Sequence, residues 1–192
     1  MRAKIMAILN VTPDSFSDGG RYDGLEAAVR RGLLMADQGA HILDIGGEST
    51  RPGAETISVD EELRRVLPVI MAIREQSRAR DDDIMISIDT RKAAVAKAAI
   101  HAGEDVWNDV SALTYDPESE SVAAQLQCPL ILMHAQGRPE TMQDNPHYEM
   151  AVSDIISWLE KRLDACEFAG IDRGLITIDP GIGFGKRQED NL

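Results

Sequence analysis

The sequence predicts an α/β fold, a TIM-type (β/α)8 barrel truncated to about six strands and five helices. Short apolar runs that are rich in Ile, Leu and Met alternate with stretches of helical periodicity, as expected for parallel strands covered by helices. Each run ends in a polar residue, in order Asn10, Asp44, Asp89, Asn108, His134 and Asp179. Barrels of this kind keep their chemistry at the C-terminal ends of the strands, so these six residues are candidate site residues.

The predicted strands follow one another at 5–9, 42–43, 84–88, 106–107, 130–133 and 175–178. The loops that leave them are long and rich in Gly, Pro, Asp and Asn, as functional loops of a barrel are. A closed barrel needs eight strands and usually about 250 residues. Six strands in 192 residues therefore predict one domain over residues 1–192 that is C-terminally incomplete, unless the fold differs.

Five helices are predicted between the strands, at 26–38, from Ser58, from Thr90, at 117–126 and at 148–169. The second begins with a capping box, Ser58-Val-Asp-Glu61. Thr90 is expected to open the third and to cap it, although Asp89 is a serious competitor for that role. The expected buried face of the fifth is Val152, Ile155, Ile156, Leu159, Leu163 and Phe168.

The composition is that of a globular protein, with 43% hydrophobic and 28% charged residues. No apolar run reaches the roughly 18 residues of a membrane span, and no signal peptide is visible. Cys128 and Cys166 form no disulfide framework, so both are expected to be reduced in a cytoplasmic protein. The net charge of −13 argues against nucleic acid and anionic membranes, and an anionic substrate would need a cation or local Arg and Lys residues.

The first motif, residues 10–20, is a strand exit dense in hydroxyl and carboxylate groups with a single aromatic residue, Phe16. A solvated turn would leave that aromatic ring unexplained, so a lid that brings Phe16 over a flat substrate is favoured. Asn10 offers an amide oxygen to a hard cation such as Mg2+.

The second motif, residues 44–53, turns sharply at Gly46-Gly47 and then presents Thr50 and Arg51. A hydroxyl and a guanidinium fork together suit an anion. The alternative is a simple ion pair between Arg51 and Glu48. In a chain of net charge −13, anion binding is the favoured interpretation.

Asp89, Asn108 and Asp179 are expected to converge at the strand ends. The Gly-rich segment 179–186 lacks the spacing of a Walker A or Rossmann motif, so it does not indicate a nucleotide site. Carboxylates and an amide suit a flat, nitrogen-rich ring with a row of N–H donors, and Met133 would pack on its face.

Protein nucleophiles and zinc have little support in the sequence. The four histidines show no ligand spacing, and His134 is expected to support the site from behind rather than to contact the ligand. There is no Gly-x-Ser-x-Gly element, and no cysteine lies on a loop that leaves a strand.

In order and spacing, the motifs resemble those of the dihydropteroate synthase family, at residues 8–20, 44–53, 87–90, 108–111, 132–134 and 179–186. The resemblance implies the condensation of (7,8-dihydropterin-6-yl)methyl diphosphate with p-aminobenzoate to 7,8-dihydropteroate and diphosphate in folate biosynthesis. It implies Mg2+ as cofactor, sulfonamides as inhibitors and a homodimer for the full-length form.

The resemblance also assigns roles to individual residues. Those expected to bind the pterin diphosphate are Thr50, Arg51, Asp89, Asn108, Met133 and Asp179, and Asn10 is expected to help hold Mg2+. The p-aminobenzoate pocket is expected to include Phe16, Asp18, Pro52 and Phe184.

The chain departs from the family pattern in three places. The seventh and eighth strand ends that grip the diphosphate in the family are absent, the N-terminus is short, and Glu104 stands where a small residue is usual. The 192-residue chain alone is therefore expected to be inactive and poorly stable. The alternatives are the pterin-binding domain of a methyltetrahydrofolate–corrinoid methyltransferase and a non-catalytic pterin-binding module.

Overall fold

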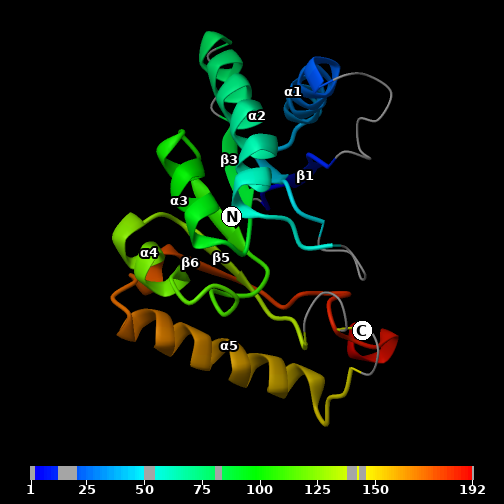
Figure 1. The fold of residues 1–192 in the computed structure, drawn as a ribbon. Helices are drawn as coiled ribbons and strands as arrows, with labels where there is room; N and C mark the ends of the chain where they lie inside the picture. The colour runs from blue at the N-terminus through cyan, green and yellow to red at the C-terminus, as the bar shows by residue number, and fades with distance from the viewer. Residues whose placement is uncertain are drawn as a thin grey trace. The chain divides into compact units, whose positions relative to one another are not determined.

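A computed structural model describes residues 3–12, 21–49, 55–80, 84–137, 142 and 146–191 (Figure 1). Its contacts divide the chain into two compact units. Unit 1 comprises Met1–Ser49, Thr56–Thr90 and Ala94–Asn108, and unit 2 comprises Thr50–Glu55, Arg91–Ala93 and Asp109–Leu192. Each unit is described by itself below.

Unit 1 is built from parallel strands that alternate with helices. Its elements are β1 (Met6–Asn10), α1 (Arg21–Asp37), β2 (Ile42–Gly46), α2 (Val59–Ala79), β3 (Met85–Asp89), most of α3 (Ala93–His101) and most of β4 (Val106–Asp109). Each strand pairs in parallel with the next one along the chain. The predicted strands are confirmed here to within a few residues.

The register places two kinds of residue on opposite faces of these strands. Fully buried residues make up one face, including Leu43, Ile45, Ile86, Ile88 and Trp107. Helix α1 lies close to that face, because a Cβ atom on its Gly32 would lie 3.2 Å from Leu9 of β1 and 3.5 Å from Leu43 of β2. The alternate positions carry the polar strand ends, which therefore share the other face.

The first turn of α2 forms as predicted. Ser58 is the N-cap, and its hydroxyl accepts a hydrogen bond from the backbone N–H of Glu61 at 3.2 Å. The start of α3 differs from the prediction, since the helix begins at Ala93 rather than at Thr90. The N–H of Ala93 donates to Asp116 at 3.0 Å, whereas the Thr90 hydroxyl donates to buried Glu62 at 2.6 Å. A carboxylate from a later loop thus serves the first turn of α3.

Unit 2 contains α4 (Ser119–Leu126), β5 (Leu130–Met133), α5 (Ala151–Phe168) and β6 (Ile176–Asp179), with short 3-10 helices η2 (Arg173–Leu175) and η3 (Gln188–Asn191). The two strands are parallel, and Met133 pairs with Asp179 at their C-terminal ends. Cys128 and Cys166 are buried, and neither forms a disulfide within the described part of the chain.

The predicted buried face of α5 is partly wrong. Ile155 and Leu159 are buried as expected, and Cys166 joins them. Val152 and Ile156 are 72% and 51% exposed, and Phe168 is 97% exposed. The three buried residues recur at spacings of four and seven, which defines a narrow stripe, and Phe168 falls on the far side of the helix.

No helix in the described part of the chain is long and apolar enough to cross a membrane.

Candidate functional site

Three of the predicted site residues of unit 1 lie together at the C-terminal ends of their strands. The register aligns Asn10 with Gly46, Gly46 with Asp89, and Asp89 with Asn108. Gly46 leaves room between its neighbours, because a Cβ atom there would lie 3.4 Å from Asp89 Oδ2 and 3.6 Å from Asn10 Oδ1. Two oxygen acceptors therefore flank one glycine, an arrangement that suits N–H donors or a hard cation.

Asp44 lies on the same face, one layer below these strand ends. Its carboxylate Oδ2 accepts a hydrogen bond from Asn108 Nδ2 at 3.0 Å. Burial raises the pKa of Asp44 to about 6, although the hydrogen bonds of Ser87 and Asn108 oppose that rise. The adjacent Gly46-Gly47 turn is held by Arg65, whose Nη1 donates to the Gly47 carbonyl oxygen at 3.0 Å.

Glu104, which stands where the family usually has a small residue, is buried two residues before the start of β4. Neither of its carboxylate oxygens has a hydrogen-bond partner among the described residues. Burial raises the pKa of Glu104 well above its usual value, and the negative charge of Asp44 adds to the rise, while Arg74 opposes it. Arg74 itself is held at 2.5 Å by Asp105. Unit 1 thus contains an acidic interior below the strand ends.

In unit 2 the predicted residues Met133 and Asp179 end adjacent strands. Asp179 Oδ1 accepts the backbone N–H of Gly181 at 2.7 Å, which shapes the first turn of the Gly-rich loop. The loop then approaches the segment after β5 very closely. A Cβ atom on Gly181 would lie 2.0 Å from the carbonyl oxygen of His134, so only glycine fits there.

The buried ammonium group of Lys186 holds this loop in its conformation. Its buried Nζ lies 3.0 Å from His134 Nδ1 and donates to the carbonyl oxygens of His134, Gly181 and Phe184 at 3.2, 2.8 and 3.0 Å. Burial lowers the pKa of Lys186 to about 8. Burial and the adjacent Lys186 charge together lower the pKa of His134 to about 4, so His134 is neutral at pH 7 and Nδ1 accepts. His134 is therefore linked through Lys186 to the Gly-rich loop.

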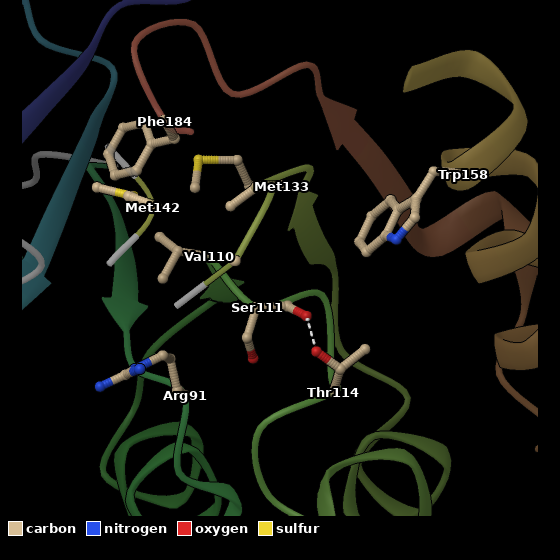
Figure 2. Close-up of a pocket in the computed structure, with 10 residues that line it drawn as sticks. Arg91, Val110, Ser111, Thr114, Met133, Met142, Trp158 and Phe184 are labelled. Carbon is tan, nitrogen blue, oxygen red and sulfur yellow. Dashed lines mark hydrogen bonds between the residues drawn. The ribbon is translucent and has the colours of Figure 1, made fainter. Parts of the chain in front are cut away.

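Met133 and Phe184 line a pocket of about 60 Å³ within unit 2 (Figure 2). The other lining residues are Arg91, Val110, Ser111, Thr114, Ala135, Gly137, Met142 and Trp158. Figure 2 shows Met133, Met142 and Phe184 grouped around one part of the cavity, which gives it a soft apolar wall. Typical ligand pockets hold roughly 300–1,000 Å³, so this pocket is too small for a complete two-ring ligand.

A rigid loop after β4 supplies another wall of the pocket. The fully buried Asp109 accepts the N–H and the hydroxyl of Ser111 at 2.7 and 2.6 Å, and the N–H of Leu113 at 3.0 Å. These bonds hold Ala112 and Leu113 at positive φ, 51° and 63°. Arg162 of α5 binds the Ala112 carbonyl oxygen at 3.0 Å, so the loop is fixed from both sides.

The sequence assigned no role to Lys186, Arg91, Ser111 or Trp158. Lys186 and Ser111 carry a sequence signal, because they end two of the motifs, 179–186 and 108–111. Five predicted residues lie outside the described part of the chain, namely Phe16, Asp18, Thr50, Arg51 and Pro52. Within the described residues, no group of three or more His, Cys, Asp or Glu is placed to hold a metal ion.

Comparison with known proteins decides the family. The sequence profile described as "Pterin binding enzyme" matches residues 6–192. The chain belongs to the pterin-binding enzyme family. The chain is 47% identical over 191 residues to a dihydropteroate synthase of Synechocystis sp., a match that covers 100% of the chain and 64% of that relative. It is 48% identical over 188 residues to the dihydropteroate synthase of Bacillus subtilis, covering 98% of the chain and 62% of that relative.

Solved structures agree with the sequence matches. Xanthomonas albilineans dihydropteroate synthase with 4-aminobenzoic acid is 48% identical, with a TM-score of 0.88 over 99% of this chain and 65% of that one. The same enzyme in complex with 7,8-dihydropteroate is 44% identical, with a TM-score of 0.84 over 99% and 64% of the two chains. The predicted α/β barrel class is confirmed for this pterin-binding enzyme. The chain spans just under two thirds of the length of these relatives.

Proposed function

We propose that this pterin-binding enzyme is a part of a dihydropteroate synthase. The whole protein would condense (7,8-dihydropterin-6-yl)methyl diphosphate with p-aminobenzoate, and would release 7,8-dihydropteroate and diphosphate, in folate biosynthesis. The observation that carries the proposal is the likeness, over 99% of this chain, to synthases solved with 4-aminobenzoic acid and with 7,8-dihydropteroate. The grouped acceptors of unit 1 support it, because they suit a ring rich in N–H donors.

The pterin ring is assigned to the strand ends. On the family resemblance, Asp89, Asn108 and Asp179 would accept N–H groups along its edge, and Met133 would pack on its face. A carboxylate accepts two parallel N–H bonds from an amidine-like edge, which selects a pterin over a ring that presents only acceptors. When diphosphate leaves, the pterin methylene becomes electron-poor, and the fixed carboxylates Asp89 and Asp179 stabilise the positive charge without reorganising.

The diphosphate is assigned to Thr50, Arg51 and the cation site at Asn10. The described part of this site fits Mg2+, because Asn10 Oδ1 and Asp89 Oδ2 both lie beside Gly46 and both are hard oxygen donors. Bound Mg2+ would neutralise charge on the leaving group. Arg51 would hold two phosphate oxygens with its guanidinium fork, and Thr50 would donate its hydroxyl. These local positive charges would offset the repulsion between an anionic substrate and a chain of net charge −13.

The p-aminobenzoate is assigned to Phe16, Asp18, Pro52 and Phe184. Phe184 lines the pocket of unit 2, and the other three lie outside the described residues. After the bond to diphosphate has broken, the amine of p-aminobenzoate would attack the pterin methylene carbon, and the proton lost from the amine would pass to solvent. No covalent enzyme intermediate is needed. We also infer that the whole protein is a cytoplasmic homodimer and that sulfonamides compete for the p-aminobenzoate site.

A methyltetrahydrofolate–corrinoid methyltransferase domain is the weaker candidate, because the relatives cited above are dihydropteroate synthases. A non-catalytic pterin-binding module remains the contrasting class. Titration calorimetry of the 192-residue chain distinguishes them. We expect the pterin diphosphate to bind more tightly with Mg2+ than without, and the Mg2+ effect to shrink in Asn10→Ala. Preference for methyltetrahydrofolate would contradict the proposal.

Turnover is the second measurement. We expect none from the isolated chain with both substrates and Mg2+, and turnover from the complete protein. A complete protein that binds pterin diphosphate but never forms 7,8-dihydropteroate would identify a binding module instead.

A further inference from the structure

The carboxylate of Asp44 reaches across one strand to a residue at the proposed pterin edge. Asp44 of β2 pairs with Ser87 of β3, while Asn108 of β4 pairs with Asp89, one layer higher. The hydrogen bond from Asn108 Nδ2 to Asp44 Oδ2, 3.0 Å long, therefore spans β3 diagonally. Asp44 is only 4% exposed, so water does not compete for this bond.

This bond decides which end of the Asn108 side chain faces away from Asp44. A carboxamide has a donor end and an acceptor end of nearly equal shape, and an ionised carboxylate only accepts. Nδ2 must therefore face Asp44, and Oδ1 is left for the opposite side. The pKa of Asp44, about 6, keeps the carboxylate mostly ionised at pH 7.

We propose that Asp44 is a positioning residue that fixes the carboxamide orientation of Asn108, and thereby makes the ligand present an N–H donor to Asn108 Oδ1. This inference rests on the proposed function, in which Asn108 meets the pterin edge. Asp44 would thus contribute to ring specificity without touching the ring. The flipped amide would instead offer an N–H group to the ligand, and a donor on the ring would then face a donor on the protein.

A double-mutant cycle tests whether Asp44 acts through Asn108. The variants are Asp44→Asn, Asn108→Ala and the two combined, and the ligand is 6-hydroxymethyl-7,8-dihydropterin, titrated by calorimetry into the 192-residue chain. Asparagine at position 44 keeps the shape of aspartate but can either donate or accept, so it no longer selects one orientation. We expect Asp44→Asn alone to weaken binding about tenfold. In the Asn108→Ala background we expect the same change to have little effect.

Asp105→Asn is the matched control. Asp105 also accepts hydrogen bonds in unit 1, at a half-buried position, from Arg74 and from the N–H of Ile86, but its partners are structural. We expect this variant to lower stability and to leave pterin affinity unchanged. If Asp44→Asn lowered pterin affinity equally with and without the Asn108 side chain, the proposal would be overturned. The effect of Asp44 would then not depend on Asn108.

The outcomes also separate this inference from the proposed function. If the wild-type chain binds the pterin and Asn108→Ala weakens it, while Asp44→Asn does not, only the role of Asp44 is wrong. If the wild-type chain binds no pterin, the function and this inference both fall. Hydrogen exchange of the Asn108 side-chain NH2 group in the wild-type chain provides a check that needs no folded variant at position 44. We expect slow exchange, and exchange at the rate of a free amide would overturn the proposal.

Discussion

Glu104 keeps an ionisable group buried in unit 1 with no hydrogen-bond partner for either oxygen among the described residues. A buried polar group without a partner costs roughly 1–3 kcal/mol, and a charged one costs more. Asp44 adds a second acid to the same interior, and each disfavours ionisation of the other. Individual residues of this chain therefore make its stability depend on pH.

We expect Glu104→Gln to gain stability over the wild type as pH rises. The folded-state pKa of Glu104 lies above its ordinary value of 4.5, so its contribution is fully present below that value. The contribution is lost as pH rises through the raised pKa. Urea unfolding at pH 5 and pH 8 measures the effect, and we expect the free energy of unfolding of the variant to increase relative to that of the wild type over this range. The same difference at both pH values would show that the pKa of Glu104 is not raised.

His134 produces the opposite pH dependence. Its pKa falls from 6.5 to about 4 in the folded state, so the unfolded chain binds the proton first and stability declines as pH falls from 6.5 toward 4. Between pH 8 and pH 5 we expect a loss of about 2 kcal/mol from this group. In His134→Gln, whose amide oxygen can still accept from Lys186, that loss should vanish. Urea midpoints at the two pH values provide the measurement, and an unchanged loss in the variant would refute the assignment.

At the scale of elements, the Gly-rich loop after β6 depends on close backbone contact. Gly181 and Gly185 approach the segment after β5, where a Cβ atom would lie 2.0 and 2.4 Å from carbonyl oxygens of His134 and Gln136. Lys186 then binds three carbonyl oxygens of the two segments. These contacts fix the loop to the segment after β5 and place Phe184 in the wall of the pocket.

Gly181→Ala and Gly183→Ala separate steric overlap from backbone conformation. Both glycines have positive φ, 68° and 83°, but a Cβ atom on Gly183 would meet nothing within 4 Å. We expect Gly183→Ala to cost about 1 kcal/mol, from its backbone conformation alone. Gly181→Ala should cost about 2 kcal/mol more, because its Cβ must displace backbone. Equal losses of unfolding free energy in the two variants would mean that the close approach contributes nothing.

Sequence patterns predicted the elements better than the contacts between them. The polar strand ends were predictable because parallel strands in chain order place their C-terminal ends at one edge. The hydrogen bond from Asn108 to Asp44 was not predictable, because it crosses over β3 and depends on the pleat and the register of the strands. The bonds of Lys186 were not predictable either, because they require the conformation of two loops. The wide apolar stripe expected on α5 was wrong because periodicity records which faces are apolar and not how much of them is covered.

On the scale of the whole molecule, apolar side chains remain exposed. They include Ile8 of β1, Ile178 of β6, and Val152 and Ile156 on α5. Val152 and Ile156 are four residues apart, so they lie on one face of the helix. Exposed apolar faces and strand edges promote association. The predicted instability of the isolated chain has its physical basis in such surfaces.

We expect the isolated chain to self-associate as its concentration rises, and the double variant V152E/I156E to associate less. Sedimentation velocity over a hundredfold concentration range measures this. Met71→Glu is the control, because Met71 is also exposed, at 60%, but belongs to a different helix, α2. A wild-type chain that stays monomeric throughout the range would contradict the prediction, as would an equal effect of the control.

The buried indole of Trp107 has a practical consequence. Its Nε1 donates to the Thr90 carbonyl oxygen at 2.8 Å inside unit 1, while Trp158, the second of the two tryptophans in the chain, borders the pocket of unit 2. Each unit therefore carries its own fluorophore. Emission spectra of Trp107→Phe and Trp158→Phe would report the melting of one unit at a time and ligand quenching at the pocket separately, without any added dye.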